Sequence, residues 1–65
     1  MITIRLRALL EERNMSQSEL ARITQIRPST ISDLCNNNSN FIKLEHIERI
    51  CSTLRCDVEE LLKIS

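Results

Sequence analysis

The sequence predicts an all-α fold, a compact bundle of five short helices in one domain spanning residues 1–65. Glycine is absent and Pro28 is the sole proline, which leaves few of the turns that an all-β fold requires. Apolar residues instead recur at spacings of three and four through most of the chain. Hydrophobic residues make up 42% of the chain, but Phe41 is its one aromatic residue. We therefore expect an aliphatic core built from Leu and Ile.

The first helix is expected at about residues 3–13, where Leu6, Leu9 and Leu10 share one face and charged residues lie opposite. Ile2 and Ile4 also alternate with polar or charged neighbours, so a short strand is the alternative for the first few residues. We favour a helix from about residue 4. Asn14, whose side chain tolerates left-handed backbone, suits the end of this helix.

Two further helices are expected back to back within residues 16–36. Ser16 and Glu19 form a capping-box pattern, in which each side chain can bond the other residue's backbone amide, so a helix starts there and runs to about Thr24. A turn follows through residues 25–27. Pro28 suits the first position of the next helix, which ends near Cys35.

The C-terminal part of the chain predicts a loop and two more helices. The polar run at residues 36–40 lacks apolar periodicity. Asp57 opens a second capping arrangement at residues 57–60. Apolar residues mark a fourth helix at Leu44, Ile47, Ile50 and Leu54, and a short fifth helix at Val58, Leu61 and Leu62.

The back-to-back pair leaves one small, polar face of its second helix exposed, which is what a DNA major groove can accept. The formal net charge of zero argues against nucleic-acid binding at first sight, but the charge is distributed unevenly. Residues 1–43 hold six bases and four acids (+2), and residues 44–65 hold three bases and five acids (−2). Binding driven by phosphate neutralisation should therefore be modest and sensitive to salt.

These features together resemble the Cro/cI-type (XRE-like) helix-turn-helix family over roughly residues 6–62. The matching positions of the family pattern are Gln17, Leu20, Ala21, Ile26, Ile31 and Leu34. The resemblance implies a five-helix, lambda-repressor-like DNA-binding domain with double-stranded DNA as its partner. It also implies a transcriptional regulator, specifically a bacterial or phage repressor. The chain departs from the pattern at Gln25, where many family members have glycine.

The resemblance implies which side chains meet DNA. The expected base-reading residues are Pro28, Ser29, Thr30, Ser32 and Asp33. The expected phosphate-binding residues are Ser16, Gln17, Arg22, Arg27, Asn36, Asn37, Asn38 and Lys43. Plain structural roles compete with these assignments, because Ser29 and Thr30 can cap a helix and Asp33 can pair with a neighbouring arginine.

Other functions find little support in the sequence. His46, Cys51 and Cys56 are five residues apart, which matches neither a helical face nor a zinc site, so neither metal nor cofactor is expected. One histidine and no phosphate-cradling glycine loop argue against an enzyme. Three unpatterned cysteines and the lack of a signal-peptide or membrane-spanning pattern indicate a cytoplasmic protein.

Two expectations concern partners. The first is a homodimer through the C-terminal helices, near Ile64, because DNA reading by one small domain gives few base contacts. The second is a rival function, a protein-interaction module that keeps the scaffold but does not read DNA. Zero net charge, and an expected reading face with Pro28, Asp33 and no basic residue, favour this rival.

Overall fold

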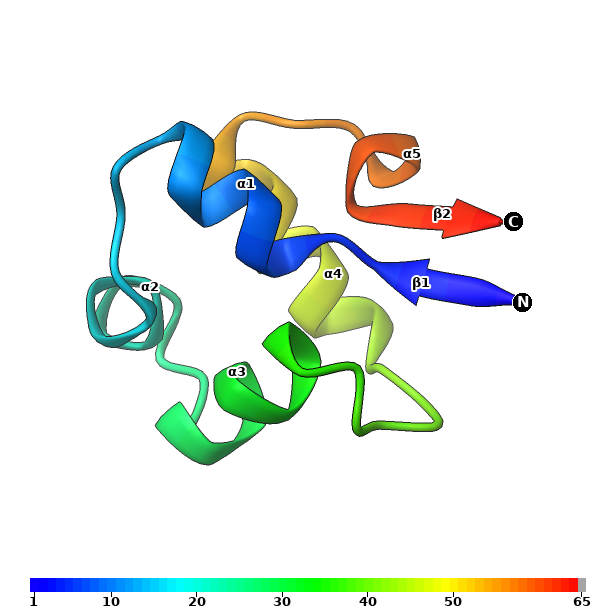
Figure 1. Cartoon of the computed structure of the whole chain (residues 1–65). Coiled ribbons are helices and arrows are strands. Elements are labelled where there is room, and N and C mark those ends of the chain that lie inside the picture. The colour runs from blue at the N-terminus through cyan, green and yellow to red at the C-terminus, as the bar shows by residue number, and fades with distance from the viewer. Residues whose placement is uncertain (65) are drawn as a thin grey trace.

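Two helices meet across a short turn in the computed structural model, which describes residues 1–64 (Figure 1). They are α2, Gln17–Thr24, and α3, Pro28–Cys35. Before them lies α1, Leu6–Glu12, and after them come α4, Leu44–Leu54, and α5, Val58–Leu61. Within the described range, these elements confirm the prediction of five helices.

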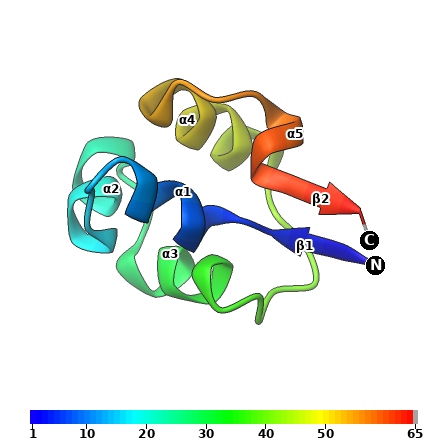
Figure 2. The same cartoon turned by 45° about the horizontal axis from the view of Figure 1, so that its top comes forward.

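A two-stranded antiparallel sheet corrects the all-α prediction. β1, Ile2–Ile4, pairs with β2, Leu62–Ile64, so that Ile2 lies opposite Ile64 at the free end of the sheet. Figures 1 and 2 both show β1 and β2 side by side. The short Ile-Thr-Ile segment is β-branched throughout, which suits a strand. Its partner lies at the opposite end of the chain, where a local pattern gives no sign of the pairing.

The first helix accordingly begins later than expected. The alternative of a strand for the first residues is correct, and α1 starts only at Leu6. The amide of Arg5 donates to the carbonyl of Leu61 at 2.7 Å, which extends the contact with the C-terminal segment and keeps Arg5 out of the helix. Asn14 has φ 52°, the left-handed conformation expected where this helix ends.

Side-chain caps start α2 and α5 where the sequence predicts them. The Glu19 amide donates to Ser16 Oγ at 3.1 Å, and the Ser16 amide donates to Glu19 Oε1 at 3.3 Å. Asp57 and Glu60 form the same reciprocal pair at the start of α5. Each box satisfies backbone donors that a helix start would otherwise leave open.

Asn37 attaches the loop after α3 to the outer edge of β1. Its Oδ1 accepts the Ile4 amide at 2.7 Å, and its Nδ2 donates to the Ile4 carbonyl at 3.1 Å. The Asn37 side chain thus behaves like one residue of a third strand and satisfies both backbone groups of Ile4. The backbone of Asn37 is itself left-handed, with φ 57°.

An aliphatic core lies between the helices, as predicted. Its members include the five apolar motif positions Leu20, Ala21, Ile26, Ile31 and Leu34. α2 packs against both α3 and α4, and α3 also contacts α1, so the core supports the inner side of α3 only. Phe41 lies outside this core. None of the helices in residues 1–64 has the length and apolar character of a membrane span.

Candidate nucleic-acid interface

The outward face of α3 is polar and accessible. Successive residues of a helix are rotated by about 100°, and Ile31, Leu34 and Cys35 point into the core. Ser29 and Asp33 therefore lie at the centre of the exposed side, and both are exposed. The structure thus leaves open the face on which the sequence places the base-reading residues.

Thr30 and Ser32 flank this central line on opposite sides. Both are half-buried, and Thr30 lies at the edge of a groove next to α3. Ser32 Oγ accepts the Asn36 side-chain amide at 3.4 Å. Pro28 stands exposed at the start of α3, where it offers apolar contact only. The five expected base-reading residues thus lie at the start of α3 or on its outward half.

The turn before α3 fixes the angle at which this helix is presented. Gln25 ends α2 in left-handed backbone with φ 60°. Thr24 is buried: its hydroxyl donates to the Leu20 carbonyl at 2.7 Å and accepts the Ile26 amide at 3.3 Å. Arg49 of α4 donates to the Thr24 carbonyl at 3.3 Å. Thr24 and Arg49 are positioning residues that the motif pattern did not reveal, since their hydrogen bonds depend on the packing of α2 on α4.

A groove of about 560 Å³ separates α3 from the segment that leads into α4. Arg27 and Lys43 stand on its lining, together with Asp33, so two cations face one acid. Both cations are exposed. The remaining lining residues are Gln25, Ile26, Thr30, Leu34, Ser39, Phe41, Ile42 and His46.

Phe41 and His46 are groove residues that the sequence reasoning did not place there. The spacing of three between Lys43 and His46 puts both at the start of α4 on one side, which was a usable signal. Phe41 is 80% exposed, so an aromatic ring and two cations are accessible along one groove. Such a lining can hold a phosphate and stack against a flat apolar group.

Ser16 and Gln17, two expected phosphate-binding residues at the start of α2, differ in how readily their side chains could contact a phosphate. The Ser16 hydroxyl belongs to the capping box, and the Glu19 carboxylate beside it would repel a phosphate. Gln17 is half-buried at the first turn of the same helix. Arg22 is exposed in the last turn, closer along the chain to the turn and α3.

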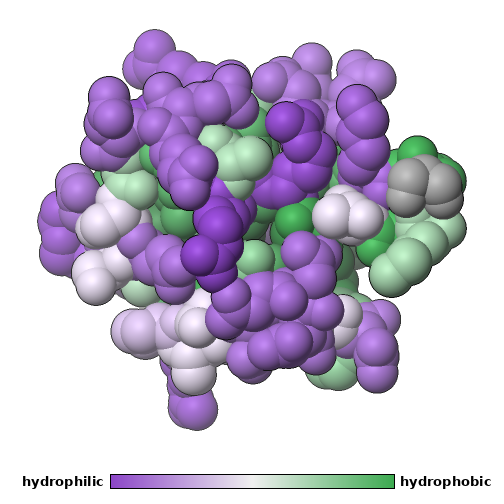
Figure 3. Space-filling model, in the orientation of Figure 1, coloured by the Kyte–Doolittle hydropathy of each residue, from purple (hydrophilic) through white to green (hydrophobic). Residues whose placement is uncertain are grey.

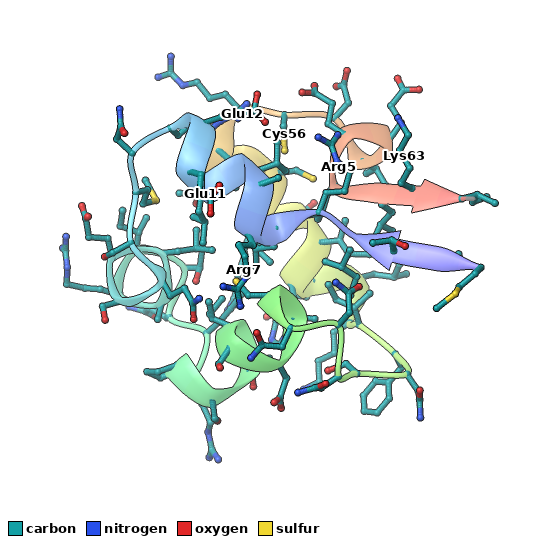
Figure 4. All side chains as sticks on the ribbon, in the orientation of Figure 1. Arg5, Arg7, Glu11, Glu12, Cys56 and Lys63 are labelled. Carbon is teal, nitrogen blue, oxygen red and sulfur yellow. The ribbon has the colours of Figure 1, made fainter. Side chains whose placement is uncertain are left out.

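The asparagine run is also divided by its hydrogen bonds. The Asn37 side chain is engaged by β1, and Asn36 Oδ1 accepts a hydrogen bond from Arg7 Nη2 of α1. Figure 4 shows Arg7 projecting from α1 toward α3. Arg7 is therefore another residue that sequence reasoning missed beside α3. Asn38 uses its backbone amide to bond the Asp33 carbonyl at 2.9 Å, and its side chain is exposed.

The cations near α3 are not neutralised by acids. Across residues 1–64 one ion pair forms, between Arg49 and Glu45 of α4 at 2.5 Å. The alternative in which Asp33 pairs with Arg22 or Arg27 is therefore absent from this part of the chain. Arg22 and Arg27 thus have no acidic partner among these residues. No cluster of three potential metal ligands occurs in the described residues.

Comparison with protein families identifies the family to which this chain belongs. The model of the Cro/C1-type HTH DNA-binding domain matches residues 5–65. The chain belongs to the Cro/C1-type helix-turn-helix family. Family and fold thus point to a DNA-binding domain rather than to an enzyme, and the resemblance stated from the sequence is confirmed.

Solved structures and a curated relative resemble this Cro/C1-type chain over nearly its whole length. A crystal structure of a putative DNA-binding protein from Bacteroides fragilis is 25% identical, with a TM-score of 0.87, and covers 97% of this chain and 100% of the other. A crystal structure of the transcriptional regulator VanUg is 28% identical, with a TM-score of 0.79, over 95% and 81% of the two chains. An uncharacterised HTH-type transcriptional regulator of Bacillus subtilis (strain 168), YozG, is 32% identical over 62 residues, which are 95% of this chain and 74% of that protein.

Proposed function

We propose that this Cro/C1-type protein is a sequence-specific transcriptional regulator, a bacterial or phage repressor, that reads the major groove with α3. The observation that carries the proposal is the exposed polar face of α3 beside a groove with two accessible cations, Arg27 and Lys43. A phosphate backbone can follow that groove while Ser29 and Asp33 face the base edges. The names of the relatives, which include two transcriptional regulators, support the same function.

The hydrogen bonds of the candidate residues reduce the number that we assign to DNA contact. Base reading is assigned to Pro28, Ser29, Thr30, Ser32 and Asp33, with Asp33 able to accept a hydrogen bond from a cytosine amino group. Phosphate binding is assigned to Gln17, Arg22, Arg27, Asn38 and Lys43. We no longer assign phosphate binding to Ser16, Asn36 and Asn37, because their side chains are already bonded within the protein.

Selection from a pool of random DNA duplexes at low salt tests the function. Enrichment of one sequence motif is the expected result. Lys43→Ala should then weaken binding to all sequences alike and reduce the salt slope by about 1, whereas Asp33→Ala should change the preferred base at one position by about 1–3 kcal/mol. Lys63→Ala, an exposed lysine on β2, is the matched control and should leave binding unchanged. If the pool yields no motif, the DNA-reading proposal is wrong.

One observation favours a protein partner as a second candidate function. Phe41 and Leu44 are 80% and 83% exposed, and residues 28–42 contain no lysine or arginine. A surface of this kind suits an apolar helix of another protein. Phe41→Ala should abolish the binding of a protein partner through this groove. Enrichment of a DNA motif by the wild-type chain would instead favour the DNA-reading function.

We assign dimer formation to the free end of the sheet rather than to the C-terminal helices. Ile2 and Ile64 are 63% and 79% exposed and lie opposite each other, and Figure 3 shows apolar surface at this edge of the molecule. The longest dimension of the chain is 29 Å, so two copies in contact fit half-sites spaced by about 34 Å. Analytical ultracentrifugation should show a dimer that Ile64→Ser converts to a monomer. A wild-type monomer on DNA would contradict this assignment.

A further inference from the structure

Two cysteines meet at the C-terminal end of α4. Cys51 lies in its last turn, and Cys56 follows Arg55, whose backbone is left-handed with φ 54°. The Cys56 amide donates to the Cys51 carbonyl at 3.0 Å, and the Arg55 amide donates to the same carbonyl. The bond from the Cys56 amide is the outer bond of a Schellman motif, in which the chain turns back so that the residue after the left-handed position faces the helix residue five before it.

The motif usually carries an apolar contact between those two positions, and here both positions are cysteines. Both thiols are free, half-buried and packed against the core. The pKa of Cys51 is raised to about 11, mainly by burial and further by the neighbouring Cys56, with which its thiol shares a hydrogen bond, and by the charges of Asp57 and Glu60. The two sulfur atoms are therefore direct neighbours, and neither is sealed from solvent.

We propose that Cys51 and Cys56 form a modification site, a dithiol that a hydroperoxide oxidises to an intramolecular disulfide while the chain stays folded. Figure 4 shows the Cys56 side chain pointing inward from the connection between α4 and α5. The hydrogen bond from the Cys56 amide to the Cys51 carbonyl already holds the two residues against each other, so we expect the disulfide to close with the helices in place. The disulfide would encircle only the left-handed turn that ends α4.

The chemistry proceeds in two balanced steps. The Cys56 sulfur attacks the peroxide, which gives a sulfenic acid on Cys56 and releases an alcohol, or water when the oxidant is hydrogen peroxide. The Cys51 sulfur then attacks the Cys56 sulfur, the new S–S bond forms, and the hydroxyl leaves with the proton of Cys51 as water. Two electrons pass from the two thiols to the peroxide. Cys51 has the second role because its thiolate is disfavoured.

The third cysteine is an internal control. Cys35 is 4% exposed within α3, and burial raises the pKa of its thiol against the opposing effect of the Arg7 charge. Buried thiols of this kind react slowly. Cys35 should therefore remain a thiol under conditions that oxidise the pair.

Stoichiometric hydrogen peroxide added to the reduced, full-length protein tests the proposal. The oxidised protein is then alkylated with N-ethylmaleimide, and the mass of the intact chain is measured. We expect a mass lower by two hydrogen atoms for the disulfide, and alkylation of one of the three cysteines. Peptide mapping should place the disulfide between Cys51 and Cys56, and dithiothreitol should restore all three thiols. Circular dichroism should remain unchanged throughout. Disulfide-linked dimers, or oxidation of the pair only in urea, would overturn the proposal.

Two serine variants test the order of the steps. Cys51→Ser should stop the reaction at the sulfenic acid, which dimedone traps on Cys56. Cys56→Ser should show little dimedone adduct at Cys51 over the same time. Equal trapping in both variants would contradict the assigned order. These readouts concern thiol chemistry alone, so their result is independent of whether the protein reads DNA.

Discussion

At the scale of single residues, Gln25 carries the conformational cost of the helix-turn-helix turn. Its φ of 60° lies in the left-handed region, where a residue with a Cβ atom is disfavoured by about 1 kcal/mol. Asn14 and Asn37 adopt the same region, which asparagine occupies more readily than most residues with a Cβ atom. The turn keeps its shape because Thr24 and Arg49 bond the backbone around it.

Gln25→Gly is therefore expected to stabilise the protein by up to about 1 kcal/mol, since glycine adopts positive φ without steric cost. Urea denaturation, followed by circular dichroism, measures the change. Ser18→Gly is the matched control, because Ser18 is exposed within α2 and should lose up to about 1 kcal/mol. Changes of the same sign in the two variants would refute the explanation.

Cys51 makes the fold sensitive to alkaline pH. Its pKa is raised from 9.0 to about 11 in the folded protein, so the native state favours the neutral thiol. The contribution of this group to stability is complete below pH 9 and is lost as the pH rises toward 11. Under reducing conditions, the urea midpoint should fall over this range more steeply for the wild type than for Cys51→Ser. Parallel curves would show that Cys51 is not responsible.

At the scale of elements, the attachment of Asn37 to β1 connects the loop after α3 with the sheet. Two short strands alone are marginally stable in water. The side chain of Asn37 supplies two hydrogen bonds to Ile4 at the outer edge of β1, and Ile4 lies opposite Leu62 in the register with β2. α3 is thus fixed at both of its ends, by Thr24 before the turn and by Asn37 after the last helical residue.

Asn37→Gly keeps the left-handed backbone accessible and removes both hydrogen bonds, so it should cost about 1–2 kcal/mol. Asn38→Gly is the control, because the Asn38 side chain is exposed and its backbone amide bond is retained. Amide hydrogen exchange at Ile4 should accelerate in Asn37→Gly and not in Asn38→Gly. Unchanged exchange at Ile4 would mean that the side chain does not hold the strand.

At the scale of the whole molecule, the sparse cations should limit how strongly binding depends on salt. Among residues 1–64, Arg22, Arg27 and Lys43 are exposed near α3 and form no ion pair, whereas the Arg7 guanidinium beside them is bonded to Asn36. Neutralisation of three phosphates by each subunit predicts a plot of log K against log salt with a slope of about −3 per half-site. Fluorescence anisotropy across a salt series measures this slope. A slope near zero with retained affinity would exclude the phosphate assignments.

The local part of the fold was predictable from the sequence, and the non-local part was not. Ser16 and Glu19 mark a helix start because a capping box involves neighbours, and Ile31 and Leu34 mark a buried face because helical spacing is local. The pairing of Ile2 with Ile64 joins residues from opposite ends of the chain, and no local pattern encodes it. The partners of the candidate site depend on packing in the same way. Asn36 and Asn37 resemble free loop amides in the sequence, yet both are bonded to residues of the N-terminal segment.

The position of the sheet has a mechanical consequence. Because Ile2 lies beside Ile64, any tether attached near either end pulls on the molecule at one place, away from α3 (Figure 1). Force applied across the two ends would separate the strands first, one pair at a time, before it reached the helical core. A reporter protein or a surface anchor joined at either end should therefore leave α3 undisturbed, but it would obstruct the dimer contact proposed at Ile2 and Ile64.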